Sequence, residues 1–375
     1  MSTQAIRSTR LASAAKLAAA LPWTAKPLIA LAPMRPSSGP HLAVAVSRAG
    51  GIGFMNFNGK PEGLTEDFET AKRSLAESSD GDTKAFADFA AGDLLPIGVG
   101  FIVWCDDRAA ATAAVEKYRP CAVWLFAPPH GQADLDEWTK GIRAVSPKTQ
   151  VWIQVGTLQE ATEAARSSQA PDVLVIQGME AGGHGRAVDG IGLTTFLPEA
   201  ADATLDTGIP LLAAGGIADA RGVVSVLALG AAGAAMGTRF LASKEARVAK
   251  SYQQAVVDAK DGAKSTARTT IYNQLRGISW PERFSPRGVT NRTWDEYQQG
   301  ASFDGLKAEF DKALGAGEAG WGPEGRLPTY AGAGVGLVNE VASAGKSWRR
   351  YGRIRLVYWK LWQAGLGSRR GLCRD

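Results

Sequence analysis

One segment of the chain combines a proton-exchanging side chain with a glycine-rich turn. Residues 177–185 read Gln-Gly-Met-Glu-Ala-Gly-Gly-His-Gly, and they follow the apolar run 172–176, which is typical of a buried strand. Glycine has no Cβ and tolerates positive φ, so this turn can approach a flat or phosphorylated ligand closely. The imidazole of His184 can exchange a proton near neutral pH. The segment therefore predicts a catalytic histidine at the end of a strand, or alternatively a turn histidine that bonds a neighbouring carbonyl.

Two further glycine-rich segments follow apolar runs later in the chain. Residues 209–217 read Ile-Pro-Leu-Leu-Ala-Ala-Gly-Gly-Ile, and residues 233–239 read Gly-Ala-Ala-Met-Gly-Thr-Arg. In a βα barrel, the loops after strands seven and eight commonly form a phosphate site from backbone N–H groups and the start of a helix. The complete Walker pattern is absent, which argues against nucleoside triphosphate chemistry. The predicted phosphate-binding residues are Gly215, Gly216, Gly237 and the hydroxyl donor Thr238.

The composition indicates a globular protein with a large core. The chain has 375 residues, of which 45% are hydrophobic and 21% charged, so it can form one barrel or two smaller domains. Its longest apolar stretches fall well short of the roughly 20 residues of a membrane helix, and we expect no membrane partner. Cys105, Cys121 and Cys373 form neither a C-x-x-C motif nor a metal-ligand spacing. They predict structural thiols in a reducing compartment and no metal site.

The first 24 residues carry three basic side chains, many alanines and serines, and no acid. This composition resembles a weak mitochondrial transit peptide. The alternative is a helix from Leu11 to Leu21 that covers the bottom of a barrel, because Pro27 leads straight into the first predicted strand. We favour the helix, and with it a cytoplasmic protein, and keep a mitochondrial location as the alternative.

The net charge of +5 is distributed unevenly. Residues 349–375 hold seven arginines and Lys360 against Asp375, so this segment carries +7 and the rest of the chain −2. A nucleic-acid site would spread its basic side chains over a folded face, with aromatic residues between them. The confinement of the charge to the end of the chain argues against a nucleic-acid partner.

The order of apolar runs predicts an α/β fold. Between the runs lie alanine-rich segments with helical spacing, such as 107–118, 134–145, 158–167 and 218–229. Strands that read as continuous apolar runs and alternate with helices indicate a parallel sheet covered by helices. Eight such units predict a (β/α)8 TIM barrel. The eight predicted strands are 28–31, 51–55, 96–101, 121–126, 150–155, 172–176, 210–214 and 233–236.

The pattern changes after Arg239. Residues 243–298 are polar, contain the turn Trp280-Pro281-Glu282-Arg283, and predict a small, mainly helical insertion over the barrel mouth. The last barrel helix is then expected at 303–313 or at 335–344. The turn 332–336 is a poor dinucleotide motif and predicts the opening of a terminal helix. We divide the chain into a barrel with the predicted phosphate site (1–242), the insertion (243–300), a return to the barrel (301–345) and an atypical basic tail (346–375).

Five motifs, in order and spacing, resemble the nitronate monooxygenase family. The resemblance runs from about Pro27 to Ser343. It implies a TIM barrel that binds FMN at its C-terminal mouth and oxidises alkyl nitronates with molecular oxygen to a carbonyl compound and nitrite. Related members are NAD(P)H-dependent quinone or enoyl reductases. The motifs are Ala32-Pro-Met34, Ala49-Gly-Gly-Ile-Gly53, Gln177 to Gly185, Ala214-Gly-Gly-Ile217 and Met236-Gly-Thr-Arg-Phe240.

The resemblance also implies roles for individual residues. Pro33 and Met34 match positions against the flavin ring, and Gln154 and Gln177 match residues that bond flavin or ribityl oxygens. His184 matches the catalytic histidine of the family. The remaining cofactor-binding positions are Gly178, then Gly182 and Gly183 close to the ribityl chain, and Gly215, Gly216, Gly237 and Thr238 at the phosphate.

The residues leave two roles open for His184. A nitronate is already an anion and needs no base, whereas a neutral nitroalkane must first lose a proton, which His184 could accept. His184 could equally stabilise the charge of the nitro group. Two other functions also stay open: an NAD(P)H-dependent quinone or enoyl reductase on the same scaffold, and a flavin-binding protein without turnover. The oligomeric state is not predicted.

Overall fold

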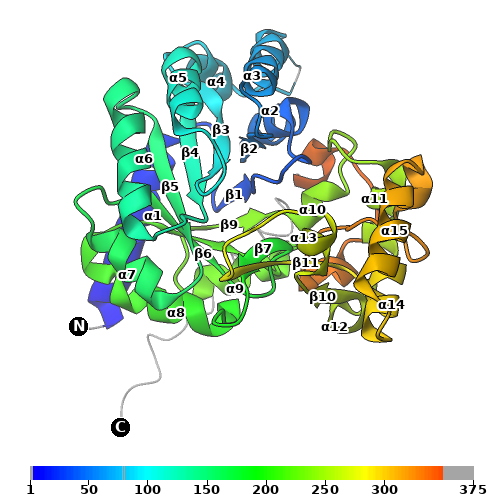
Figure 1. Ribbon diagram of the computed structural model, residues 1–375. Coiled ribbons are helices and arrows are strands. Elements are labelled where there is room, and N and C mark those ends of the chain that lie inside the picture. The colour runs from blue at the N-terminus through cyan, green and yellow to red at the C-terminus, as the bar shows by residue number, and fades with distance from the viewer. Residues whose placement is uncertain (1–2, 78, 80, 349–375) are drawn as a thin grey trace.

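Eight parallel strands form a closed barrel, as the apolar runs predict. The computed structural model describes residues 3–77, 79 and 81–348. Neighbouring strands pair in chain order, and the last pairs with the first (Figure 1). The observed strand bounds differ from the predicted ones by at most one residue. The barrel strands are β1 (Leu28–Leu31), β2 (Ile52–Asn56), β3 (Leu95–Ile102), β4 (Pro120–Phe126), β5 (Gln150–Val155), β6 (Val173–Gln177), β8 (Leu211–Ala214) and β9 (Gly233–Met236).

Helices cover the outside of the barrel. Several begin at a side chain that accepts the first free N–H groups, for example Asp107 from Ala109 and Ala110 and Asp219 from Arg221 and Gly222. Such caps satisfy donors that have no partner within the helix. The helices are α2 (Pro40–Arg48), α3 (Pro61–Ala76), α4 (Lys84–Ala90), α5 (Arg108–Tyr118), α6 (Gln132–Val145), α7 (Leu158–Arg166), α8 (Leu193–Ala203), which a 3-10 turn (Leu205–Thr207) follows, and α9 (Ala220–Ala228).

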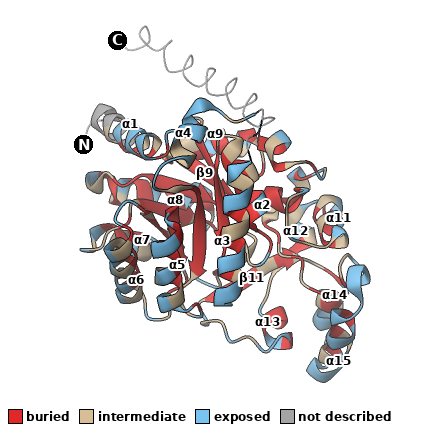
Figure 2. Cartoon of the chain, turned by 90° about the horizontal axis from the view of Figure 1, so that it is seen from above, coloured by how far each residue is buried: buried red, intermediate tan, exposed pale blue. Residues whose placement is uncertain are grey.

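The barrel strands are buried on both faces, which explains why they read as continuous apolar runs. Along β1, Leu28 and Ala30 belong to the cluster inside the barrel. Ile29 and Leu31 belong to the cluster between the strands and the helices. Figure 2 shows the buried strands at the centre with helices around them.

The first helix, α1 (Thr3–Ala20), packs on the barrel. Its Leu17 and the following Leu21 lie in the interior cluster, together with Leu28 and Ile52 from the first residues of β1 and β2. These strand residues lie at the N-terminal end of the barrel, so α1 packs at the bottom, where the predicted helix was expected.

The insertion contains a sheet that the sequence did not predict. Strands β10 (Thr266–Arg268) and β11 (Phe284–Val289) lie in the stretch expected to form helices and loops. They form a three-stranded sheet in the order β10, β11, β7, all antiparallel. β7 (Gly183–Arg186) comes from the glycine-rich segment after β6 and carries His184. The polar composition of 266–289 conceals these strands, because they pair with each other at the barrel mouth and do not enter the core.

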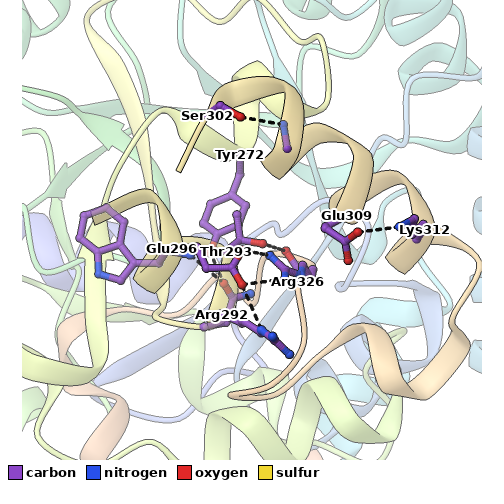
Figure 3. A network of polar contacts seen from close by, with 11 residues as sticks. Tyr272, Arg292, Thr293, Glu296, Ser302, Glu309, Lys312 and Arg326 are labelled. Atoms are coloured by element: carbon purple, nitrogen blue, oxygen red, sulfur yellow. Dashed lines mark hydrogen bonds and ion pairs between the residues drawn. The ribbon is translucent and has the colours of Figure 1, made fainter. Parts of the chain in front are cut away.

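The helices of the insertion and of the segment that follows it form a layer beside the barrel mouth (Figure 1). Polar contacts hold this layer together, as Figure 3 shows. The Arg326 guanidinium bonds Glu296 at 2.8 Å, and Thr293 donates to the Arg326 carbonyl at 3.0 Å. The Tyr272 hydroxyl donates to Asn291 at 2.6 Å. The helices are α11 (Lys250–Asp258), α12 (Gly262–Ser265), α13 (Ile271–Leu275), α14 (Arg292–Gln298) and α15 (Phe303–Leu314), with 3-10 turns Gly317–Gly320 and Ala333–Leu337.

Neither predicted position for the last barrel helix is correct. Residues 303–314 form α15, which packs on α13 of the insertion, and residues 333–337 form only a short 3-10 turn. The chain becomes helical at 344–348. There Ala344 and Trp348 enter the cluster between strands and helices. Two residues of the predicted tail, Ser347 and Trp348, are thus buried, and the rest of the tail, 349–375, lies outside the described residues.

Candidate active site

A cavity of about 780 Å³ opens at the C-terminal ends of the barrel strands. This size lies within the range of sites that enclose a small ligand. The loops after the barrel strands form its base, and residues of the insertion form its outer wall. All but one of the residues predicted to bind the cofactor or act in catalysis line the cavity. The lining residues are Pro33, Met34, Gln154, Gln177, Gly182, Gly183, His184, Gly215, Gly216, Gly237 and Thr238.

The exception is Gly178, which lies behind the cavity wall. Its N–H donates to the Ala214 carbonyl at 2.9 Å. A Cβ on this residue would lie 2.3 Å from Oε2 of Glu180 and 2.8 Å from Leu193. Gly178 is therefore required by the packing of the loop, and the sequence motif could not distinguish this from a ligand contact.

The loops after β8 and β9 form one lobe of the cavity. Gly215 and Gly216 have φ of 107° and 70°, a conformation that favours glycine. Thr238 starts the short helix α10 (Thr238–Leu241), and its hydroxyl accepts a hydrogen bond from Gly332 N at 2.9 Å. The hydroxyl proton remains available to a ligand. This lobe has the backbone geometry and the donor that a phosphate group requires.

The turn 332–336 closes this lobe from outside. The N–H of Ala333 donates to the Glu180 carbonyl at 2.8 Å. A Cβ on Gly334 would lie 2.7 Å from the Gly216 carbonyl oxygen. Glycine at this position lets the two backbones meet, so residues 90 or more positions apart in the chain share one site.

The loops after β1, β3, β5 and β6 form a flatter wall. A Cβ on Gly100 would lie 2.4 Å from Pro33, so glycine in β3 allows the Pro33 ring to sit against the strand. Gln154 accepts a hydrogen bond from Trp124 Nε1 at 2.9 Å, which fixes its amide. Gln177 is held more loosely, with Nε2 3.5 Å from the His184 carbonyl. The wall presents an apolar surface edged by two amides.

His184 lies in an aromatic enclosure that was not predicted from the sequence. Its imidazole stacks on Trp280, with ring centroids 3.6 Å apart and planes at 10°, and meets Tyr330 edge-on at 5.8 Å. Its Nε2 lies 3.0 Å from Oδ1 of Asn273 on α13. If the imidazole donates Nε2–H to this oxygen, Nδ1 remains as the acceptor. The Trp280-Pro281 turn was the only sequence signal for this contact, and nothing local linked it to His184.

The enclosure keeps the imidazole neutral. Burial lowers the pKa of His184 from its ordinary value of 6.5 to about 3, and the positive charges of Arg276 and Arg268 act in the same direction. The bond to Asn273 opposes this shift only in part. An imidazole with so low a pKa is a weak proton acceptor at neutral pH. The arrangement makes His184 a weak general base, and the one N–H of the neutral ring is already donated to Asn273.

The charged residues that line the cavity are arginines, and no Asp or Glu is among its described lining residues. Arg35 pairs with Asp106, and Arg247 pairs with Asp67 at 2.6 Å. Arg276 has no carboxylate within ion-pair distance among the described residues. Its Nη1 lies 3.3 Å from the Tyr330 hydroxyl. The cavity thus offers one uncompensated positive charge beside the His184 enclosure, which favours an anionic ligand.

The described residues contain no candidate for two other kinds of site. No group of three or more His, Cys, Asp or Glu side chains is arranged to hold a metal ion. Within the same part of the chain, no helix is both long and apolar enough to cross a membrane.

Comparison with known proteins gave consistent matches. The nitronate monooxygenase family model matches residues 139–279. Nitronate monooxygenase npaC of Metarhizium robertsii is 56% identical over 329 residues, which cover 88% of this chain and 90% of the relative. A nitronate monooxygenase of Neurospora crassa is 32% identical over 353 residues, with 89% and 90% covered.

Solved structures share the fold. FabK from Thermotoga maritima aligns with a TM-score of 0.69 and 23% identity, over 93% of this chain and 98% of the other. A nitroalkane oxidase from Streptomyces ansochromogenes aligns with a TM-score of 0.68 and 24% identity, over 92% and 99%. At these identities the likeness supports the barrel architecture.

Proposed function

The chain belongs to the nitronate monooxygenase family, and we propose that it uses FMN and molecular oxygen to oxidise alkyl nitronates to a carbonyl compound and nitrite. The observation that carries the proposal is the charge of the cavity. Arginines line it without any acid among the described lining residues, and a neutral imidazole lies beside the uncompensated Arg276. A nitronate is a small anion that needs no base, so it matches this site better than a neutral nitroalkane does.

The lining residues fit FMN. Gly215 and Gly216 adopt positive φ beside the start of α10, where backbone N–H groups and the Thr238 hydroxyl can hold a phosphate. Pro33 and Met34 offer the apolar wall for the ring, and Gln154 and Gln177 offer amides to its polar edge. When bound, FMN takes electrons from the substrate and passes them to oxygen. We propose one non-covalent FMN per chain and no FAD, because no adenine-binding pattern accompanies the phosphate loops.

The protein residues then position and stabilise the substrate. Arg276 attracts the anion into the cavity and can donate to its nitro oxygens, and the neutral His184 imidazole, whose one N–H is donated to Asn273, adds no second charge beside it. Trp280 and Tyr330 exclude water around the imidazole, which strengthens these interactions because the local dielectric is low.

Assays on the purified yellow protein test the proposal. We expect oxygen uptake and nitrite release that depend on an alkyl nitronate, and a heat-released cofactor that chromatographs as FMN. NADH oxidation with a quinone, in the absence of nitronate-dependent oxygen uptake, would assign the alternative reductase function. A colourless protein, or a cofactor that chromatographs as FAD, would contradict the cofactor assignment.

Gly216→Val tests the phosphate lobe. A branched residue at φ 70° is strained, and its Cβ would lie 3.0 Å from Glu180 at the edge of the lobe, so the variant should lose its flavin. Gly208→Val is the matched control. Gly208 has φ 64° and no atom within 4 Å of an added Cβ, and it lies outside the cavity lining. Flavin lost equally from both variants would show that backbone strain alone is responsible.

A further inference from the structure

The loop before His184 has every backbone carbonyl from Gly178 to Ala181 engaged. The Gly178 carbonyl accepts from Ala181 N at 3.1 Å, and the Glu180 carbonyl accepts from Ala333 N at 2.8 Å. The other two carbonyls, of Met179 and Ala181, accept from side chains of the insertion. This loop leads directly into Gly182, Gly183 and β7, so its conformation determines where the His184 backbone enters the cavity.

The donors to these two carbonyls are Arg268 on β10 and Arg287 on β11. Arg268 Nη2 bonds the Met179 carbonyl at 3.2 Å and the Ala181 carbonyl at 3.0 Å. Arg287 Nε bonds the same Met179 carbonyl at 3.3 Å. The two residues are direct cross-strand partners. Two neighbouring guanidinium groups therefore hold the same loop at a shared oxygen.

Placing two neighbouring guanidinium groups here without a carboxylate partner destabilises the fold. The hydrogen bonds to the carbonyls must offset this cost. Neither arginine has a carboxylate within 4.0 Å among the described residues. Burial and the charge of Arg287 together lower the pKa of Arg268 to about 10. Like charges facing each other across two strands repel. Buried cations persist where their N–H groups are hydrogen-bonded, and bonds from a charged donor are stronger than neutral ones.

Arg268 also contacts the pairing of β7 and β11 beside His184. His184 faces Pro286 across the two strands. The Pro286 carbonyl accepts from Thr269 N at 3.0 Å, so the backbone polar groups of Pro286 face β10 and not β7. The Arg268 Nη1 group bonds the neighbouring Ser285 carbonyl. Arg268 therefore ties β11 as well as β10 to the loop.

We propose that Arg268 and Arg287 are positioning residues, which fix the backbone of residues 179–181 so that His184 keeps its place in the cavity. The inference rests on the proposed function for its catalytic consequence, but the backbone restraint itself does not depend on that function. Neither arginine lines the cavity, so each acts through the loop and not on the substrate.

The test uses Arg268→Met, Arg287→Met and the double variant as flavin-loaded full-length proteins. Displacement of a catalytic group by about 1 Å can cost ~100-fold in rate, so we expect kcat per bound flavin to fall ~10- to 100-fold with a smaller change in KM. Because both side chains hold the Met179 carbonyl, the double variant should lose less than the product of the single losses. Arg268→Lys should recover part of the rate, since it keeps a charged donor.

Hydrogen–deuterium exchange supplies a readout that does not depend on turnover. The peptide covering 177–186 should exchange faster in both single variants, with the barrel strands unchanged. Arg143→Met is the matched control. Its guanidinium donates to the Ala170 carbonyl at 2.8 Å, and it lies outside the cavity lining. It should leave both kcat per flavin and the exchange of 177–186 unchanged.

The outcomes of these experiments distinguish the positioning role of the two arginines from the proposed function. Unchanged kcat per flavin with unchanged or uniformly faster exchange would overturn the positioning role and leave a general contribution to stability. Wild-type protein that turns over no nitronate would overturn the proposed function. Faster exchange confined to 177–186 would then still support the backbone restraint.

Discussion

The imidazole of His184 lies flat against the indole of Trp280, with ring centroids 3.6 Å apart. The two residues come from different layers: His184 follows barrel strand β6, and Trp280 belongs to the insertion. Their contact closes one side of the cavity and covers one face of the imidazole, which is partly buried. The insertion therefore sets the protonation state of the candidate catalytic residue as well as the shape of its surroundings.

His184→Asn distinguishes the two roles of the imidazole. If His184 contributes only as a neutral polar group, the variant should keep its flavin and lose turnover by a similar factor, ~10-fold or more, on a nitronate and on its parent nitroalkane. If His184 acts as a base, the loss on the nitroalkane should be ~100-fold or more, with most nitronate activity retained. Steady-state rates on freshly prepared nitronate and on the nitroalkane decide between the two.

The low pKa of His184 predicts how stability depends on pH. In the folded protein this pKa is about 3, below the ordinary 6.5, so between these values the unfolded chain binds a proton that the folded protein does not. The contribution of the neutral His184 to the free energy of unfolding is fully present above pH 6.5. It is lost as the pH falls toward 3, because the unfolded chain then binds the proton. Between pH 7.5 and pH 5 we expect this group to remove roughly 1–2 kcal/mol of unfolding free energy.

Urea titrations of wild type and His184→Asn at both pH values measure this effect. The variant lacks the ionisation, so its free energy of unfolding should fall less between pH 7.5 and pH 5 than that of wild type. An equal fall in both proteins would mean that the imidazole titrates normally in the fold.

Asn273→Asp should raise the pKa of His184. A carboxylate in place of the amide would lie about 3 Å from Nε2, and an opposite charge at that distance favours the imidazolium. Asn273→Ala removes the bond without adding a charge and serves as the control. NMR titration of the imidazole should show a higher pKa in the Asp variant only, and identical titrations in both variants would rule out the direct contact.

Arg276→Gln should weaken binding of the anionic substrate. We expect a higher KM for the nitronate, a small change in kcat, and a KM that responds less to ionic strength than in wild type, because salt screens an exposed charge. Lys264→Gln is a suitable control, since this cation is also exposed on the insertion but does not line the cavity. A KM unchanged by Arg276→Gln would remove the residue from substrate recognition.

Trp348→Ala should destabilise the protein, although Trp348 lies in the predicted tail. The side chain is 7% exposed, and its ring occupies the space beside Gly50 and Gly51 at the start of β2. Truncation of a buried Trp typically costs about 3–5 kcal/mol. Truncation of the chain after Ser347 should produce a similar loss, whereas truncation after Trp348 tests the remaining tail alone. Equal stability of the two truncated chains would contradict a packing role for Trp348.

Local sequence patterns were sufficient for the barrel and for the loops that line it. The barrel strands are buried on both faces, so each reads as an apolar run of the right length, and the intervening helices carry their own periodicity. Gly215 and Gly216 mark their loop because only glycine adopts positive φ easily. These signals lie within single βα units, and for this reason the strand bounds and the glycine-rich loops could be predicted, whereas Pro33, Met34, Gln154 and Gln177 were predicted through the family resemblance.

The surroundings of His184 were decided by the tertiary structure. Trp280, Asn273 and Tyr330 lie between 89 and 146 positions away along the chain, and no local periodicity connects them with the imidazole. Strands β10 and β11 are short, and they pair with each other and, through β11, with β7. The pKa of His184 depends on the water that these segments exclude. Burial by distant segments is a property of the assembled fold, whereas strand length and glycine conformation are already present in the local sequence.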